Sequence, residues 1–178
     1  MKRFILFFLL LPVFAASQSC CGEHISERFA FITQRDSVFA QNQITYTGNL
    51  RDLRLRTYEA VGNDCQYRPL LVLVHGGAFG GGSFDQMGDI ANQFARRGYV
   101  VISAGYRTGF ASSGPLCPSD TTELIRAWYR GIQDIRGAIR WSKDRHEQLR
   151  IDTNLVFAAG WSAGAYICSG LAYLDLES

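Results

Sequence analysis

The chain has 178 residues, of which 47% are hydrophobic and 19% charged, enough to build the core of one globular domain. Its 18 basic residues nearly balance 16 acidic ones. We therefore expect neither a basic surface for nucleic acid nor a polybasic membrane patch. No internal repeat or low-complexity linker divides the sequence, which indicates a single domain.

Residues 1–17 have the features of a secretory signal peptide. Two basic residues precede the apolar stretch from Phe4 to Val13, and small residues follow it. The stretch is too short for a membrane span, which needs about 20 residues. We expect cleavage after Ser17 and export to the periplasm or the exterior, without a stable membrane anchor. Lipidation of Cys20 and an uncleaved N-terminal anchor are the alternatives.

The next part of the chain contains few signals until the first buried strand. We interpret residues 18–43 as an irregular lead-in to a domain that spans residues 44–178. Segments 44–46 and 53–58 alternate apolar and polar residues, as half-exposed edge strands do. The run from Leu70 to Val74 is continuously apolar and branched, which is typical of a strand buried on both faces.

This buried strand runs directly into His75-Gly76-Gly77-Ala78. Glycines at such a point let the backbone approach a ligand with its N–H groups exposed. In acyl transfer these groups receive the negative oxygen of the tetrahedral intermediate, so the segment is a candidate oxyanion loop. The glycines that follow match neither a dinucleotide fingerprint nor a phosphate loop, and we predict no cofactor.

Two helices and a strand are predicted between this loop and the next motif. Apolar residues from Met87 to Ala95 share one helical face, and a strand at 99–103 follows. Residues 105–119 predict a long loop. Asp120 then caps a helix whose apolar face runs from Leu124 to Ile139. Two glycines inside this helix indicate close packing against the sheet.

The apolar run from Leu155 to Ala159 predicts another buried strand, and Gly160-Trp161-Ser162-Ala163-Gly164 follows it. This is the G-x-S-x-G pattern of a nucleophile elbow, in which a serine stands at a tight strand-to-helix turn. Side chains at 160 and 164 would collide with the neighbouring backbone, which explains the glycines. Strands alternating with helices predict an α/β fold with a mostly parallel sheet and helices on both faces.

The two motifs in this order resemble the α/β-hydrolase superfamily, in particular secreted bacterial esterases and lipases of carboxylesterase type with a His-Gly-Gly oxyanion loop. The resemblance covers roughly residues 44–178 and includes Tyr106-Arg107 and the helix segment from Asp134 to Trp141. It implies a serine hydrolase in which Ser162 attacks a small-molecule carboxylic ester and forms an acyl-enzyme that water releases.

The resemblance also implies roles for the residues around Ser162. The backbone N–H groups of Gly77, Ala78 and Ala163 would form the oxyanion hole. Ala78 stands where many relatives have a third glycine, but it keeps its N–H. His75 and Gly76 would be structural in the oxyanion loop, as Gly160 and Gly164 would be in the elbow.

The acid and the histidine of the catalytic triad have no candidates after Ser162. In the superfamily they follow the nucleophile, but residues 165–178 contain no histidine, and their one aspartate, Asp175, lies on the predicted helix that leads away from the elbow. His24, His75 and His146 all precede it. We therefore expect these 178 residues to be a C-terminally truncated part of a hydrolase domain, inactive alone, with both residues beyond position 178.

The cysteines and the alternative functions complete the interpretation. All five cysteines lie beyond the signal peptide, and Cys65 and Cys117, in polar loops, are the candidate disulfide pair. We expect Cys168 to be a buried thiol, and no residues cluster at metal-binding spacing. A non-catalytic binding or adhesion domain and a secreted peptidase of the same fold are the alternative functions. The oligomeric state stays open.

Overall fold

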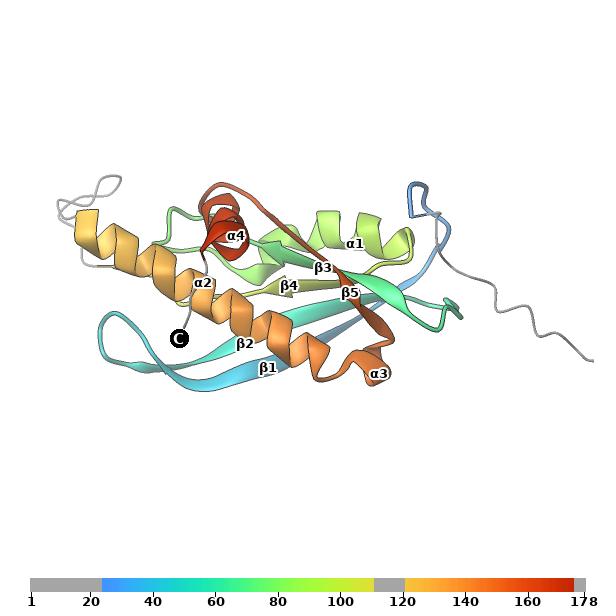
Figure 1. Ribbon diagram of the computed structural model, residues 1–178, viewed down its shortest axis with the longest axis horizontal. Helices are drawn as coiled ribbons and strands as arrows, with labels where there is room; N and C mark the ends of the chain where they lie inside the picture. The colour runs from blue at the N-terminus through green and yellow to red at the C-terminus, as the bar shows by residue number, and fades with distance from the viewer. Residues whose placement is uncertain (1–23, 111–120, 175–178) are drawn as a thin grey trace, which may run out of the picture.

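The computed structural model describes residues 24–110 and 121–174, which build one mixed sheet between helices (Figure 1). The strands are β1 (Ile32–Ile44), β2 (Leu50–Ala60), β3 (Arg68–Val74), β4 (Val100–Ala104) and β5 (Ile151–Gly160). Their spatial order is β1-β2-β4-β3-β5. β4, β3 and β5 run parallel, whereas β1–β2 and β2–β4 are antiparallel pairs.

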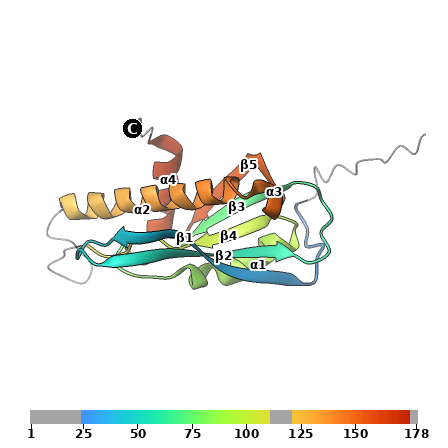
Figure 2. The same cartoon turned by 90° about the horizontal axis from the view of Figure 1, so that it is seen from below.

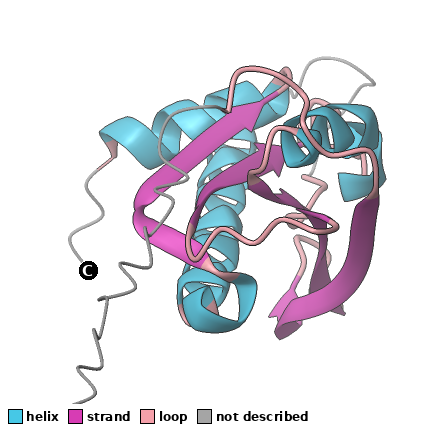
Figure 3. Cartoon of the chain, turned by 90° about the vertical axis from the view of Figure 1, so that its right-hand side faces the viewer, coloured by secondary structure: helices cyan, strands magenta, loops and turns pink. Residues whose placement is uncertain are grey.

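The helices cover both faces of this sheet, as the sequence predicts. They are η1 (Phe84–Met87), α1 (Gly88–Arg96), α2 (Thr121–Lys143), α3 (His146–Leu149) and α4 (Ala163–Tyr173). α1 lies on one face, and α2 and α4 lie on the other (Figure 2). A view along the long axis shows the twist of the strands between them (Figure 3). No described helix has the length and apolar character needed to cross a membrane.

Burial explains why the central strands are apolar throughout. Every residue of β3 and of β4 is buried, because helices cover both of their faces. β2 instead buries alternate residues along much of its length, including Leu53, Leu55 and Thr57. The carboxyl end of β3 therefore lies in the packed core. The predicted burial of β5 is wrong, because β5 is the last strand of the described sheet and is buried only at Ile151. The two candidate catalytic motifs follow the ends of β3 and β5.

Three predictions about the N-terminal part are wrong. The interpretation of residues 18–43 as irregular fails because β1 occupies Ile32–Ile44. β1 is an edge strand with mostly exposed side chains, so its sequence lacks the apolar alternation that marks a strand. The segment 44–46 is mainly the turn after β1. β2, expected at an edge, lies between β1 and β4.

Gly131, the first of the two glycines in α2, serves a helix contact and not, as expected, close packing on the sheet. A Cβ atom on Gly131 would lie 2.6 Å from Cδ1 of Ile167 on α4. Gly170 of α4 faces α2 in the same way: a Cβ atom there would lie 2.3 Å from Cδ1 of Ile132. The second glycine of α2, Gly137, has only ordinary contacts, with Phe39 of β1. Small residues at the crossing thus let α2 and α4 approach closely above β5.

Candidate active site

Ser162 lies at the tip of the turn between β5 and α4. Its backbone has φ 52° and ψ −117°, in the positive-φ range that side-chain-bearing residues rarely adopt. The turn is closed by hydrogen bonds from the Gly164 N–H to the Trp161 carbonyl (2.9 Å) and from the Ala165 N–H to the Ser162 carbonyl (2.9 Å). Ser162 is exposed, so its hydroxyl is accessible. This geometry is that of a nucleophile elbow.

The glycines that flank Ser162 have no room for a side chain. A Cβ atom on Gly160 would lie 2.3 Å from the carbonyl carbon and oxygen of Gly164. One on Gly164 would lie 2.2 Å from the carbonyl oxygen of Val74, at the end of β3. The Trp161 N–H donates to that same oxygen at 3.1 Å. The elbow is therefore packed, backbone against backbone, onto the strand that carries the candidate oxyanion loop.

The candidate oxyanion loop has an unusual backbone. Gly77, Ala78 and Phe79 have positive φ values of 112°, 51° and 61°. The Gly77 carbonyl accepts hydrogen bonds from the N–H groups of Gly80 (2.9 Å) and Gly81 (3.1 Å), which turns the loop back on itself. Two consecutive non-glycine residues at positive φ are strained, a feature that clusters at functional sites.

The three predicted oxyanion donors have no acceptor within the described part of the chain. Among residues 24–110 and 121–174, no acceptor takes the N–H of Gly77, Ala78 or Ala163. The Ala163 N–H is the first of α4, where helix N–H groups have no partner within the helix. A Cβ atom on Gly76 would lie 3.0 Å from Cδ1 of Trp161 and 3.2 Å from Cβ of Ser162. The loop and the elbow thus present free donors around one serine.

His75 is buried beneath the loop and is not placed as a base. Its Nδ1–H donates to the Gly76 carbonyl at 2.7 Å, and its ring stacks on Tyr106 with 4.3 Å between centroids. Burial lowers the pKa of His75, so the imidazole is neutral near pH 7. Gly82 packs so closely on the ring that a Cβ atom there would lie 2.5 Å from Nδ1.

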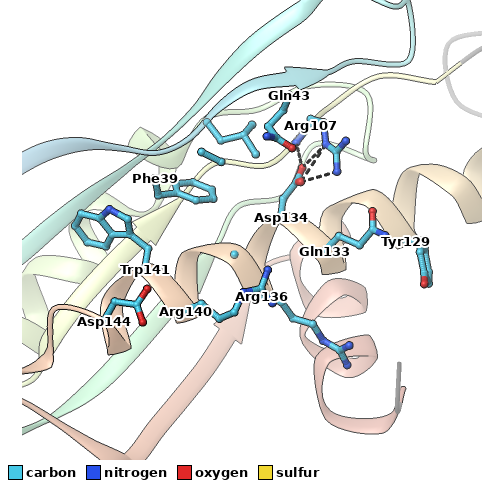
Figure 4. Close-up of a pocket in the computed structure, with 13 residues that line it drawn as sticks. Phe39, Gln43, Arg107, Tyr129, Gln133, Asp134, Arg136, Arg140, Trp141 and Asp144 are labelled. Atoms are coloured by element: carbon cyan, nitrogen blue, oxygen red, sulfur yellow. Dashed lines mark hydrogen bonds and ion pairs between the residues drawn. The ribbon is translucent and has the colours of Figure 1, made fainter. Parts of the chain in front are cut away.

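A second polar group, which the sequence did not single out as part of the site, supports this loop. The Tyr106 hydroxyl lies 3.2 Å from the His75 carbonyl oxygen and 3.4 Å from that of Gly76. The next residue, Arg107, forms a buried ion pair with Asp134 of α2 (Figure 4). Asp134 also accepts the Arg107 backbone N–H at 2.7 Å. The Tyr106-Arg107 pair could have indicated this support from the sequence. It directly follows β4, which pairs with β3, the strand that leads into the candidate oxyanion loop.

A well-formed hollow of the described residues lies away from Ser162. A cavity of about 670 Å³ separates α2 from the β1–β2 hairpin (Figure 4). Its lining includes Phe39, Gln43, Arg140 and Trp141, but not Ser162 or any predicted oxyanion residue. The strained serine and the neighbouring N–H groups, and not this cavity, therefore define the candidate site.

The cysteines and the metal prediction can be compared with the structure only in part. Cys65 is disulfide-bonded, but its expected partner, Cys117, lies outside the described residues, so the pairing stays a prediction. Cys168 is a free, half-buried thiol, and burial raises its pKa to about 11. The described residues contain no group of His, Cys, Asp or Glu side chains that could hold a metal ion.

The fold and the serine elbow define a protein of the α/β-hydrolase class. The chain belongs to the BD-FAE family, whose profile matches residues 58–177. This match begins in β2 and ends after α4, so it includes both candidate motifs. The α/β-hydrolase fold expected from the sequence is confirmed.

Individual relatives are hydrolases or esterases. The chain is 36% identical over 110 residues to a probable N-octanoylanthranilate hydrolase of Rhodococcus erythropolis, matching 60% of this chain and 22% of that protein. It is 29% identical over 99 residues to the fumonisin B1 esterase of Sphingopyxis macrogoltabida, matching 54% of this chain and 18% of that protein.

Solved structures agree on the fold. Esterase 2 of Thermogutta terrifontis, phosphorylated by paraoxon, superimposes with a TM-score of 0.60 at 24% identity. The superposition covers 77% of this chain and 46% of that esterase. The chain thus spans less than a quarter of the length of the two curated relatives, and under half of the solved esterase.

Proposed function

We propose that the protein is a serine hydrolase of carboxylic esters, with Ser162 as the nucleophile. The observation that carries the proposal is the placement of an exposed, positive-φ serine against a loop with free backbone N–H groups. Attack by the Ser162 hydroxyl on an ester carbonyl forms a tetrahedral oxyanion. The N–H groups of Gly77, Ala78 and Ala163 receive that oxyanion, the alcohol leaves, and water releases the acid.

The mechanism needs a base to take the hydroxyl proton of Ser162. His75 does not fill this role in the proposal, because its Nδ1–H is bonded to the Gly76 carbonyl beneath the loop. The base and its acid partner are proposed to come from chain beyond residue 178, in the superfamily order. The relatives' names support acyl-bond hydrolysis: one is an N-octanoylanthranilate hydrolase and another a fumonisin B1 esterase.

A matched pair of substrates tests the proposal. The protein, expressed from its complete natural reading frame, is assayed with p-nitrophenyl esters of short and medium acyl chains and with the corresponding p-nitroanilides. We expect ester turnover that Ser162→Ala abolishes, with slower anilide turnover. Faster anilide turnover would assign a peptidase or amidase. Ester turnover by Ser162→Ala equal to the wild type would refute the nucleophile, and no turnover in either would favour a binding domain.

We also propose that the protein is exported. The basic start, the short apolar stretch and the small residues before Gln18 support a cleaved signal peptide. N-terminal sequencing of the protein from its native host tests this directly. A mature chain that begins at Gln18 is expected. A chain that begins at Met1 would contradict export by this route, and a lipidated Cys20 would make it a lipoprotein.

A further inference from the structure

The orientation of one peptide group decides whether Gly77 can act as an oxyanion donor. The Gly76 carbonyl and the Gly77 N–H belong to the same planar unit, and in a trans peptide they point in opposite directions. Whatever holds the Gly76 oxygen therefore also aims the Gly77 N–H. Since glycine on both sides leaves the neighbouring dihedrals free, this unit needs hydrogen bonds to keep its orientation.

Two buried side chains hold the Gly76 oxygen. The His75 Nδ1–H donates to it at 2.7 Å, and the Tyr106 hydroxyl lies 3.4 Å from it and 3.2 Å from the preceding carbonyl oxygen, that of His75. The hydroxyl thus spans two consecutive peptide units of the loop. A donor on a carbonyl also polarises the peptide, which strengthens the N–H on its other side as a donor.

Tyr106 is itself fixed in place. Its side chain is 1% exposed, and its ring stacks nearly parallel on His75, at an interplanar angle of 14°. The N–H of the next residue, Arg107, donates to the Asp134 carboxylate, which anchors this stretch of backbone to α2. Burial raises the pKa of Tyr106 to about 12, so the hydroxyl keeps its proton across the working pH range.

We propose that Tyr106 is a positioning residue of the oxyanion hole, which aims the Gly77 N–H through the Gly76 carbonyl. The inference rests on the proposed hydrolase function. Tyr106 does not touch the substrate; it acts through the peptide that does. Its bonds are longer than that of His75, so we expect its loss to weaken the donor without removing it.

The test compares Tyr106→Phe with Tyr58→Phe in the protein from its complete reading frame. Both hydroxyls belong to buried tyrosines, but Tyr58 lies on β2, and its hydroxyl would be 3.5 Å from a Cβ atom on Gly88, away from the loop. For Tyr106→Phe we expect kcat to fall about tenfold with KM unchanged, less than the 10²–10³ that loss of a whole oxyanion donor costs. Affinity for a trifluoromethyl ketone, which forms a tetrahedral adduct with serine, should fall in parallel. Tyr58→Phe should leave kcat, KM and the affinity for the ketone unchanged.

A second readout needs no substrate. The ¹⁵N resonance of Gly77 responds to hydrogen bonding at the Gly76 carbonyl, so Tyr106→Phe should shift it and Tyr58→Phe should not. If Tyr106→Phe does not fold, 3-fluorotyrosine at position 106 makes a stronger donor and should move the resonance the opposite way. An unmoved resonance, or a kcat change no larger than that of Tyr58→Phe, overturns the inference. If the wild-type protein shows no turnover, the proposed hydrolase function is wrong. The Gly77 resonance still tests whether Tyr106 orients the peptide between Gly76 and Gly77.

Discussion

A Cβ atom on Gly76 would lie 3.2 Å from the Cβ atom of Ser162 and 3.0 Å from the carbonyl oxygen of Trp161. The candidate oxyanion loop and the elbow, far apart in the sequence, therefore pack directly against each other at Gly76. Parallel pairing of β3 with β5 brings this about, because both motifs begin where these strands end.

The contact between the elbow and β3 predicts that Gly164 tolerates no side chain. Gly164→Ala places a Cβ atom 2.2 Å from the Val74 carbonyl oxygen, and backbone cannot yield as a side chain does. We expect a loss of about 3 kcal/mol or more in the free energy of unfolding. Gly80→Ala is the matched control, since its Cβ atom would have only an ordinary contact at 3.9 Å. Urea unfolding of both variants measures the difference; equal stability would refute the packing argument.

The ion pair of Arg107 and Asp134 should be structurally important. Asp134 is 5% exposed and accepts bonds from the Arg107 backbone and side chain. Asp134→Asn leaves a half-buried guanidinium without its counter-charge, at a cost of about 3–5 kcal/mol. The control is Glu123→Gln, whose partner Arg126 is exposed, so at most about 1 kcal/mol is expected. Thermal melting of both variants separates these outcomes, and a similar shift would contradict the account.

Burial of neutral His75 predicts acid-sensitive stability. Its pKa is lowered from 6.5 in the fold, so below about pH 6.5 the unfolded chain binds a proton that the folded chain does not. Stability is therefore complete above pH 6.5 and falls, by up to about 1.4 kcal/mol per pH unit, as the pH drops toward the folded pKa. His75→Asn should flatten this part of the profile. Urea unfolding at pH 7.5 and 5.5 tests it; parallel profiles would show that His75 contributes nothing.

The disulfide prediction concerns Cys65 and Cys117. A bridge between them closes a loop of about 50 residues, for which the chain-entropy relation gives a stabilisation of about 4 kcal/mol. Peptide mapping of exported protein without reduction should recover the two cysteines in one linked pair, with Cys168 as a free thiol. Recovery of Cys65 linked to Cys20 or Cys21 would show that the pairing is wrong.

The parts that sequence predicted best have strong local signals. Apolar runs marked the positions of β3 and β5, although only β3 is buried throughout. The glycines around Ser162 marked the elbow, because a side chain at either glycine would collide with neighbouring backbone. β1 was missed because an exposed edge strand needs no apolar alternation. The links from Tyr106 to Gly76 and from Arg107 to Asp134 depend on tertiary placement, which no local pattern encodes.

Covalent labelling tests most directly whether Ser162 is an activated nucleophile. The protein from its complete reading frame is treated with a fluorophosphonate, digested and analysed by mass spectrometry, beside Ser162→Ala. We predict one adduct, on the Ser162 side chain, in wild-type protein and none in the variant. An adduct on another residue, or the same labelling in Ser162→Ala, would contradict the assignment.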